Sequence, residues 1–414
     1  MKGAFIDLRP LRVVAYRRLW VGQVLSGFGG QLTFVAVMFQ VWDQTSSPAW
    51  TGAVGLAQAL PLIVLGLFAG TLVDRLERRR IYLVTTIGQL LVASVMASQL
   101  VFGRVPVGVL LVLIGVQACF GATAGPVART VLPHLLTRDQ LAAGIALNRI
   151  GFQGAMLLGP ALGGLIIGAW GVGVCYLIDA VSFIAALYGV LGLPRMQIES
   201  TAKPGLRGVW DGLTFVASTP VIRGALITDL AATVLSMPIS LFPVINAERF
   251  GNNPRTLGLF LTAIAVGGVI STVFSGTFTR LPRHGVVMLC GSGAWGIALL
   301  LFAFSPVPWL ALVCLAVAGA ADTLAVVSRS TIIQLYTPPE LLGRVSAAEQ
   351  IVGQAGPDLG NLRGGLVAQF TSPVTSLASG ALLCIAAVAG VAASTPGLRS
   401  RTSEGDGAEA GVAH

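Results

Sequence analysis

Long apolar runs, separated by short polar segments, follow one another along almost the whole chain. A helix needs about 20 predominantly apolar residues to cross the hydrocarbon of a bilayer, and each run is roughly that long. The pattern therefore predicts twelve membrane-spanning helices. The predicted spans are residues 19–42, 50–73, 81–102, 107–131, 145–168, 172–193, 221–245, 256–279, 286–304, 309–332, 346–370 and 375–395.

The chain carries too few charged residues for a soluble protein. Of its 414 residues, 55% are hydrophobic and 10% are charged, whereas soluble domains average about 25% charged residues. Its five cysteines and three histidines are scattered, without the spacing of a disulfide framework or a zinc site. We therefore expect a polytopic membrane protein with no metal and no other cofactor.

The net charge of +9 has a topological explanation. Predicted inner segments hold most of the Arg and Lys residues, whereas the predicted outer loops hold only Arg104, Arg249 and Arg255. Short loops rich in Arg and Lys are retained on the cytoplasmic side of a membrane. The distribution predicts a multi-pass protein of the cell membrane that has both termini in the cytoplasm, contacts the lipid bilayer and binds no nucleic acid.

The longest polar break divides the chain into two related halves. Shifting the numbering by 200 residues aligns Arg129 with Arg329 and Leu135 with Leu335. Repeated halves are typical of secondary transporters, which bind their substrate between the repeats near the bilayer midplane. The predicted parts are an N-terminal six-helix half at 1–193, a cytoplasmic linker with an amphipathic segment at 194–219, a C-terminal six-helix half at 220–395 and a disordered cytoplasmic tail at 396–414.

The densest charge cluster lies in the predicted inner loop that ends at Arg80. Gly70 permits close packing of its helix, and Asp74 is suited to cap the N-terminus of a facing helix. Arg75 and Arg78 are placed to pair with acidic groups across the two halves. The loop resembles the signature loop of the major facilitator transporters, and this resemblance implies that the four residues act as a gating contact. A basic loop that only sets topology is the alternative.

Glycines cluster around one proline in the predicted fifth span. Gly159, Gly163 and Gly164 let neighbouring helices approach closely. Pro160 permits a kink whose freed backbone groups are bonded inside the bundle. The pattern resembles a motif of drug-exporting antiporters, with one extra residue after Gly154, and implies conformational gating. Generic packing of small residues is the alternative.

Ionisable residues inside membrane spans are costly, so each is a functional hypothesis. The candidates for proton coupling are Asp322, Asp358, Asp229 and Asp179. The candidates for binding substrate or acting as counter-ions are Arg149, Arg363 and Glu349. Arg149 and Glu349 occupy matching positions in the two halves and are candidates to pair with each other. A buried hydrogen bond between helices is the alternative for each residue.

A resemblance to a known family runs through the twelve-helix body. It is carried by residues 74–81, DRLERRRI, and 337–345, TPPELLGRV. These segments resemble the enterobactin exporter family of the major facilitator superfamily, and they are shared with multidrug efflux relatives. The resemblance implies an all-α integral membrane fold of twelve helices in two pseudo-symmetric halves, acting as a monomer. A carboxylate near Asp358 fits the family pattern, whereas Arg363 departs from it.

These observations predict a secondary active exporter. It would move a small organic molecule by alternating access, with protons as the coupling partner and a catechol-type siderophore as the leading substrate. The chain contains no Gly-x-x-x-x-Gly-Lys phosphate loop, so ATP is not the expected energy source. A multidrug or antibiotic efflux pump is the alternative. A membrane enzyme or a receptor is a remote one, because no catalytic constellation is present in the sequence.

Overall fold

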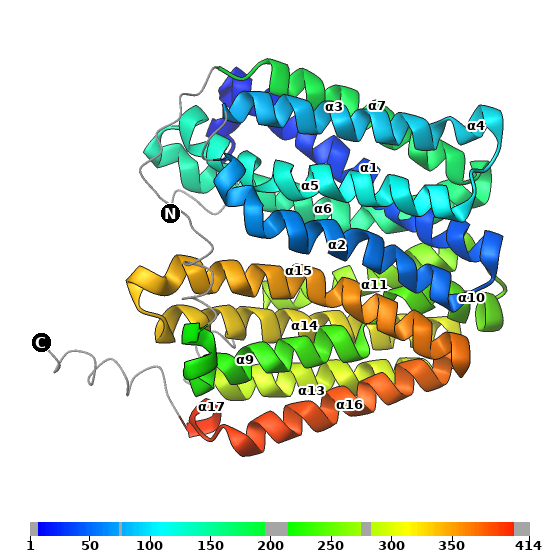
Figure 1. The fold of residues 1–414 in the computed structure, drawn as a ribbon, viewed down its shortest axis with the longest axis vertical. Coiled ribbons are helices and arrows are strands. Elements are labelled where there is room, and N and C mark those ends of the chain that lie inside the picture. Colours follow the sequence, from blue (N-terminus) through cyan, green and yellow to red (C-terminus); the bar gives the residue numbers. More distant parts are fainter. Residues whose placement is uncertain (1–6, 74–76, 195–213, 275–282, 401–414) are drawn as a thin grey trace, which may run out of the picture. The chain divides into compact units, whose positions relative to one another are not determined.

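The computed structural model of the protein describes residues 7–73, 77–194, 214–274 and 283–400. Every regular element within these ranges is a helix (Figure 1). Eleven segments of the described chain are long and apolar enough to cross a membrane. They coincide with eleven of the predicted spans, and most extend a few residues beyond the predicted limits.

The remaining predicted span is α15 (Pro339–Phe370). Its 32 residues make it long enough to cross a bilayer, since a helix rises about 1.5 Å per residue. Charged side chains such as Arg344, Glu349, Asp358 and Arg363 keep its hydropathy low. These charges distinguish α15 from a simple lipid-facing helix. Because intramembrane charges are usually functional, α15 is a candidate for a functional role.

Prolines mark where many of the helices begin. A proline at the first helical position has no N–H to leave unpaired, and its fixed φ suits a helix. Helices that begin this way in the described chain are α2 (Pro48–Val73), α9 (Pro220–Leu230), α11 (Pro254–Val273), α14 (Pro308–Tyr336), α15 and α16 (Pro373–Ser394). The prolines in the sequence thus mark where these helices begin in the structure.

The chain groups into two compact units. The first contains η1 (Arg9–Arg12), α1 (Val14–Thr45), the part of α2 from Leu60, α3 (Arg78–Ala97), α4 (Gln99–Phe102), α5 (Val107–Leu135), α6 (Arg138–Trp170), α7 (Val172–Leu191) and Asn253–Thr262 from the start of α11. The second contains Ser47–Ala59, α9, α10 (Phe242–Phe250), the rest of α11, α13 (His284–Ala303), α14, α15, α16 and α17 (Gly397–Ser400). Each unit therefore includes a short segment that precedes or follows its main body in sequence.

The interior of the first unit is formed mainly by α1 and α7, which pack along each other, and α3 lies beside α7 (Figure 1). One apolar cluster joins Leu19, Tyr82, Val131 and Val190. Burying such side chains is favourable by roughly 1.5–3 kcal/mol each in water, but within a bilayer tight packing takes over that role. The unit is accordingly rich in close helix pairs.

The second unit is built around α13, α14 and α16, with α13 beside both neighbours (Figure 1). An apolar cluster of Ile222, Leu226, Ile333 and Val345 joins α9, α14 and α15. The predicted span at 221–245 lies within a membrane-spanning segment, Pro220–Phe250, whose helix is interrupted. After α9 the helix widens into a π turn, η2 (Ala231–Leu235), and resumes through the 3-10 turn η3 (Ile239–Leu241). Pro238 precedes η3 and cannot donate a backbone hydrogen bond, which explains the interruption.

Two predicted segments lie partly outside the described residues. Residues 195–213 of the predicted linker and 401–414 of the predicted tail are not described. The start of the tail is helical, because α17 forms at Gly397–Ser400. Its Leu398 is buried and lies against Gly285, so these first tail residues are ordered against the second unit.

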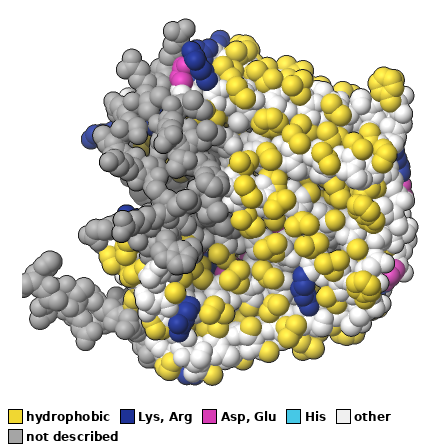
Figure 2. All heavy atoms as spheres, in the orientation of Figure 1, with side chains coloured by type: hydrophobic (Ala, Val, Ile, Leu, Met, Phe, Trp, Pro, Cys, Tyr) yellow, Lys and Arg dark blue, Asp and Glu magenta, His cyan; other side chains and the backbone are white. Residues whose placement is uncertain are grey.

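Large hydrophobic side chains cover the outside of the described helices. Figure 2 shows them spread over the visible face, with few charged side chains among them. Phe102, Leu60 and Val112 are among many that are largely exposed. A soluble protein rarely exposes so much contiguous apolar surface. The surface is that of a multi-pass membrane protein, whose outer side chains contact lipid.

Candidate functional site

Charged side chains gather inside the second unit, where α9, α13, α14 and α15 meet. Asp229 lies near the end of α9, directly before the π turn. Asp322 and Arg329 are about two helical turns apart on α14 and therefore share one face. Glu349 comes from α15. Four ionisable groups that are far apart in sequence thus belong to one site.

Arg329 is the centre of this cluster. Its Nη1 donates to Asp229 Oδ1, and its Nε lies 3.4 Å from Glu349 Oε1. Ser330 adds a hydrogen bond of 2.8 Å from its hydroxyl to the same Glu349 oxygen. A buried charge is costly unless it is paired and hydrogen-bonded. Two carboxylates therefore stabilise one guanidinium, and each of them is itself partly neutralised.

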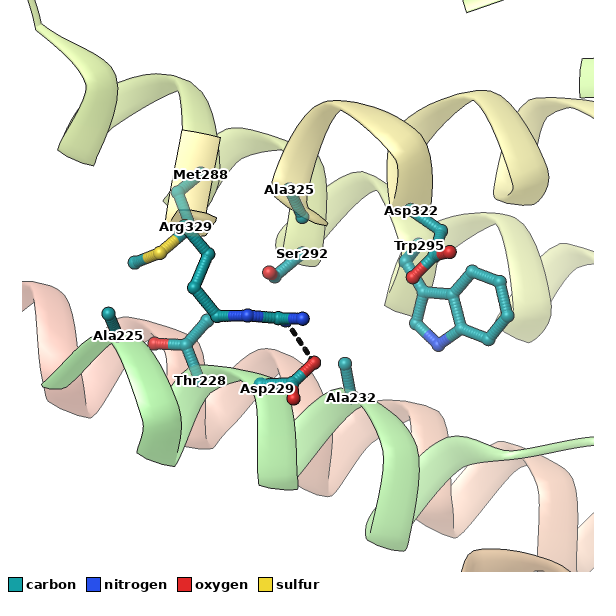
Figure 3. A pocket seen from close by; sticks show the side chains of 10 residues that line it. All are labelled: Ala225, Thr228, Asp229, Ala232, Met288, Ser292, Trp295, Asp322, Ala325 and Arg329. Carbon is teal, nitrogen blue, oxygen red and sulfur yellow. Dashed lines mark hydrogen bonds and ion pairs between the residues drawn. The ribbon is translucent and has the colours of Figure 1, made fainter. Parts of the chain in front are cut away.

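A small cavity opens beside the ion pair. Figure 3 shows Arg329 reaching toward Asp229 on one side and Asp322 beside Trp295 on the other. The cavity has a volume of about 10 Å³, which is about the space that one water molecule occupies. Its ten lining residues are Ala225, Thr228, Asp229, Ala232, Met288, Ser292, Trp295, Asp322, Ala325 and Arg329.

Two carboxylate groups at this cavity have unused hydrogen-bonding capacity. Asp229 Oδ2 is buried and has no hydrogen-bond partner among the described residues. Asp322 lines the cavity, and no described residue donates a hydrogen bond to its side chain. A buried carboxylate oxygen normally has a partner. These oxygens are therefore positioned to take up a proton or to bond a water molecule in the cavity.

The profile of the transmembrane secretion effector family matches residues 6–407. The chain belongs to this family of transmembrane secretion effectors. Among curated proteins, this secretion effector is 31% identical to the multidrug efflux pump Tap of Mycolicibacterium fortuitum, over 87% of this chain and 89% of Tap. It is 27% identical to the enterobactin exporter EntS of Shigella boydii serotype 18, over 90% of each chain.

Solved transporters share the fold of this secretion effector at low sequence identity. The nucleoside transporter NupG aligns with a TM-score of 0.73 and 13% identity, over 92% of this chain and 98% of NupG. A D-xylose–proton symporter aligns with a TM-score of 0.69 and 13% identity, over 92% and 97% of the two chains. These matches confirm the predicted major facilitator fold. The family assignment and the similarity to Tap and EntS identify an efflux-type transporter and not an enzyme.

The other predicted proton-coupling residues occupy different surroundings in this secretion effector. Asp179 is buried in the first unit, where the hydroxyl of Thr33 donates to its Oδ2 at 2.8 Å. The Ser182 hydroxyl donates to the Asp179 backbone oxygen at 2.6 Å. Asp358 is half-buried on α15, and no described residue donates a hydrogen bond to its side chain. Neither residue belongs to the Arg329 cluster.

The predicted substrate or counter-ion residues also separate. Glu349 bonds to Arg329 and Ser330 of its own unit, as described above. Arg149 is an exposed residue of α6, and its pairing with Glu349 stays a prediction. Arg363, on α15, donates to the backbone oxygen of Leu235 at the interruption after α9.

The predicted gating loop is described only in part. Gly70 lies in α2, whereas Asp74 and Arg75 lie outside the described residues. Arg78 Nη1 lies 3.2 Å from Nε2 of His134, within the first unit. Pairing of Arg78 with an acidic group of the other half stays a prediction.

The glycines around Pro160 contact two different helices. Gly159 and Gly163 lie against Gln31 and Val35 of α1. Gly164 lies so close to Pro254 at the start of α11 that a Cβ there would collide with the Pro254 carbonyl oxygen. The predicted close helix approach is thus present at this motif, and its role in gating stays a prediction.

A matching contact occurs in the second unit. A Cβ on Gly365 of α15 would collide with the carbonyl oxygen of Pro48 at the start of α2. In both units a glycine therefore lies against the carbonyl of a proline that begins a helix. α6 and α15 are corresponding helices of the predicted repeat, although the 200-residue shift aligns Gly164 with Gly364, the neighbour of Gly365.

Arg329 is the member of the charged cluster that was not a candidate site residue in the sequence analysis. It is buried between Asp229 and Glu349. The sequence did contain a signal for Arg329, because its spacing from Asp322 places both residues on one face of α14. Trp295 and Ser292 gave no signal, because apolar and small polar side chains are common in every span.

Proposed function

We propose that this protein is a proton-driven exporter of a small organic molecule. The observation that carries the proposal is the Arg329 cluster, with Asp322 beside it at a cavity inside a membrane-spanning bundle. Charged groups at such positions commonly form proton relays or substrate sites in transporters. Protons and a small-molecule substrate are the partners in this proposal.

Charge balance explains how the cluster would couple to protons. One guanidinium faces the carboxylates of Asp229, Glu349 and Asp322, so it cannot neutralise all three. Proton binding at Asp322 would remove one negative charge from a low-dielectric region. A proton shifts a conformational equilibrium only if the two states differ in affinity for it. Release of Arg329 from Asp229 toward ionised Asp322 would supply that difference.

Alternating access requires helix contacts that form in one state and part in the other. The proline–glycine contacts at Gly164 and Gly365 are suited to this role, because each joins two helices through backbone atoms and a few residues. With the predicted orientation, both contacts lie toward the outside. We assign Gly159, Pro160, Gly163 and Gly164 to gating on this basis, together with the loop that contains Asp74.

A catechol-type siderophore is the leading substrate, and a range of drugs is the alternative. The similarity to EntS supports the first, and the somewhat higher identity to Tap supports the second. Deleting the gene and measuring both phenotypes would separate them. Loss of siderophore secretion under iron limitation, with unchanged drug tolerance, supports siderophore export. Raised drug sensitivity with normal secretion supports the pump.

Reconstituted vesicles test the proposal directly. An imposed proton gradient should drive transport of 2,3-dihydroxybenzoate, as a catechol probe, or of ethidium, as a drug probe. Asp322→Asn should abolish the dependence on the gradient, because an amide cannot carry the proton. Asp43→Asn is the matched control, since Asp43 pairs with Arg104 at a helix end away from the cavity. The mechanism would be contradicted if transport by the wild type did not depend on the proton gradient. It would also be contradicted if transport by Asp322→Asn depended on the gradient as fully as in the wild type.

We infer further that the protein is a monomer in the cell membrane with both termini in the cytoplasm. The basic N-terminal segment and the arginines of the 77–80 turn support this orientation. A tag at the C-terminus should be cleaved by protease only after the membrane is permeabilised. Cleavage in intact cells would reverse the orientation and place the Gly164 and Gly365 contacts inside.

A further inference from the structure

The interruption between α9 and α10 leaves backbone groups without helical partners in the middle of a span. The π turn ends at Leu235, and the 3-10 turn begins at Ile239. Interrupted helices occur at membrane depth only where protein or a cavity satisfies the freed groups. In transporters such interruptions commonly lie at binding sites.

Residues of two neighbouring helices, α13 and α15, bond this interruption. Trp295 of α13 donates its indole N–H to the Ser236 hydroxyl at 2.9 Å. Asn361 of α15 accepts from the backbone N–H of Ser240 at 3.0 Å, and its own backbone oxygen accepts from the Ser240 hydroxyl at 2.8 Å. Ser240 and Asn361 are both buried. The interruption is therefore a fixed feature and not a loosely packed turn.

Arg363 is the charged member of this group. Its Nη1 donates to the Leu235 backbone oxygen. Gly380 of α16 makes room for this bond, since a Cβ there would lie 2.5 Å from Arg363 Nη1 and would collide with the Leu235 oxygen. The bond fixes one edge of the guanidinium, and a guanidinium carries five N–H donors in a planar fork. The other donors of Arg363 have no recorded partner among the described residues.

Arg363 differs from Arg329 in its charge balance. Arg329 pairs with Asp229 and Glu349, whereas no carboxylate of the described residues lies within ion-pair distance of Arg363. Arg363 is half-buried, so its donors are not sealed inside the protein. An arginine kept in a membrane span without a carboxylate partner is costly, and such residues mark substrate or ion pathways.

We propose that Arg363 is a specificity-determining residue that selects substrates bearing a delocalised organic anion, such as a carboxylate. This inference rests on the proposed transport function. The planar fork of a guanidinium matches a carboxylate in a bidentate geometry. The Leu235 carbonyl orients the fork, and the incoming anion supplies the charge that the protein does not. A cationic substrate would face an unpaired positive charge at this position.

Three probes in the reconstituted full-length protein test the assignment. They are 2,3-dihydroxybenzoate, its uncharged methyl ester and the cation ethidium. The wild type should bind and transport the anion in preference to the ester. Arg363→Gln should weaken anion binding by about tenfold to a hundredfold, the loss typical of a hydrogen bond to a charged group. Binding of the ester should change little.

Two further variants separate charge recognition from folding. Arg363→Lys keeps the positive charge but loses the planar fork, so it should retain a preference for the anion that is weaker than that of the wild type. Arg249→Gln is the matched control, because Arg249 also donates to backbone oxygens, those of Ala303 and Ser305, but at a helix end. It should leave the preference unchanged.

The outcomes for this inference and for the transport function are distinct. Suppose that a proton gradient drives transport of at least one probe. If the wild type then shows no preference for the anion, or if Arg363→Gln keeps that preference, the role of Arg363 alone is overturned. Absence of gradient-driven transport for all three probes counts against the proposed function. Anion preference that persists in binding assays under that outcome would still support the role of Arg363.

Discussion

Arg329 and Asp229 form an ion pair in which the two side chains are only 8% and 6% exposed. They come from α14 and α9, which lie far apart in sequence. Breaking a buried pair leaves a desolvated charge, whereas replacing both partners often costs little. Loss of one partner alone should therefore cost more stability than replacement of both partners.

Removing Arg329 should destabilise the protein strongly. Arg329→Gln leaves Asp229 and Glu349 buried without a cation, at a cost of about 3–5 kcal/mol. Thermal unfolding in detergent should show a clearly lower midpoint. The double variant Asp229→Asn with Arg329→Gln should recover part of the loss, because only Glu349 then remains as a carboxylate without its cation. A double variant as unstable as Arg329→Gln alone would show that the pair is not the cause.

Asp179 should be dispensable for proton coupling. Its carboxylate bonds to hydroxyl groups of Thr33 and Ser182, and no described basic side chain pairs with it. Asn offers an oxygen and a donor of the same shape, and a hydroxyl can accept as well as donate. We expect Asp179→Asn to retain gradient-driven transport and to change stability by less than about 1.5 kcal/mol. Loss of coupling in Asp179→Asn, with normal coupling in Asp322→Asn, would move the proton site to the first unit.

The two proline–glycine contacts should tolerate no added methyl group. Gly164→Ala and Gly365→Ala place a Cβ against the carbonyl oxygens of Pro254 and Pro48. Overpacking of this kind costs about 1–3 kcal/mol, and transport should slow because one conformation is disfavoured. Gly154→Ala is the matched control, since nothing lies near its Cβ position. Equal transport rates in all three variants would remove these contacts from the gating mechanism.

Asp74 is expected to act in gating and not in folding. Its equivalent in the second half is missing from the repeat, so its charge is present on one side of the pseudo-symmetry only. Asp74→Asn should lower transport while expression and thermal stability stay normal. Glu77→Gln is the control in the same loop, because Glu77 pairs with exposed Arg80 and such surface pairs contribute little. If Asp74→Asn transported as fast as the wild type, the loop would have no gating role and would only set the orientation of the protein in the membrane.

The helices of the fold were largely predictable from the sequence. Apolar runs define the spans because the hydrocarbon thickness fixes their length, and prolines define many of the starts. The interruption at Pro238 was not predicted. The segment is apolar like the other spans, and contacts with Trp295, Asn361 and Arg363 from other helices stabilise the interruption.

The candidate site was predictable as a set of residues but not as an arrangement. The cost of burying charge singled out Asp229, Asp322 and Glu349 from the sequence alone. The same rule applied to Arg329, yet its partners come from α9 and α15, and no spacing rule connects residues on different helices. Arg363 was noticed for its charge, whereas its bond to Leu235 depended on the unpredicted interruption.

Each compact unit includes the beginning of a helix whose remainder belongs to the other unit. This division has a consequence for how the chain is assembled. Ser47–Ala59 packs with the second unit, and Asn253–Thr262 packs with the first. If the chain were cut within 195–213 and the two pieces were made as separate polypeptides, each would carry a segment that the other needs. Neither piece would complete its own packing alone, so co-expression, and not separate refolding, would be the route to a working protein.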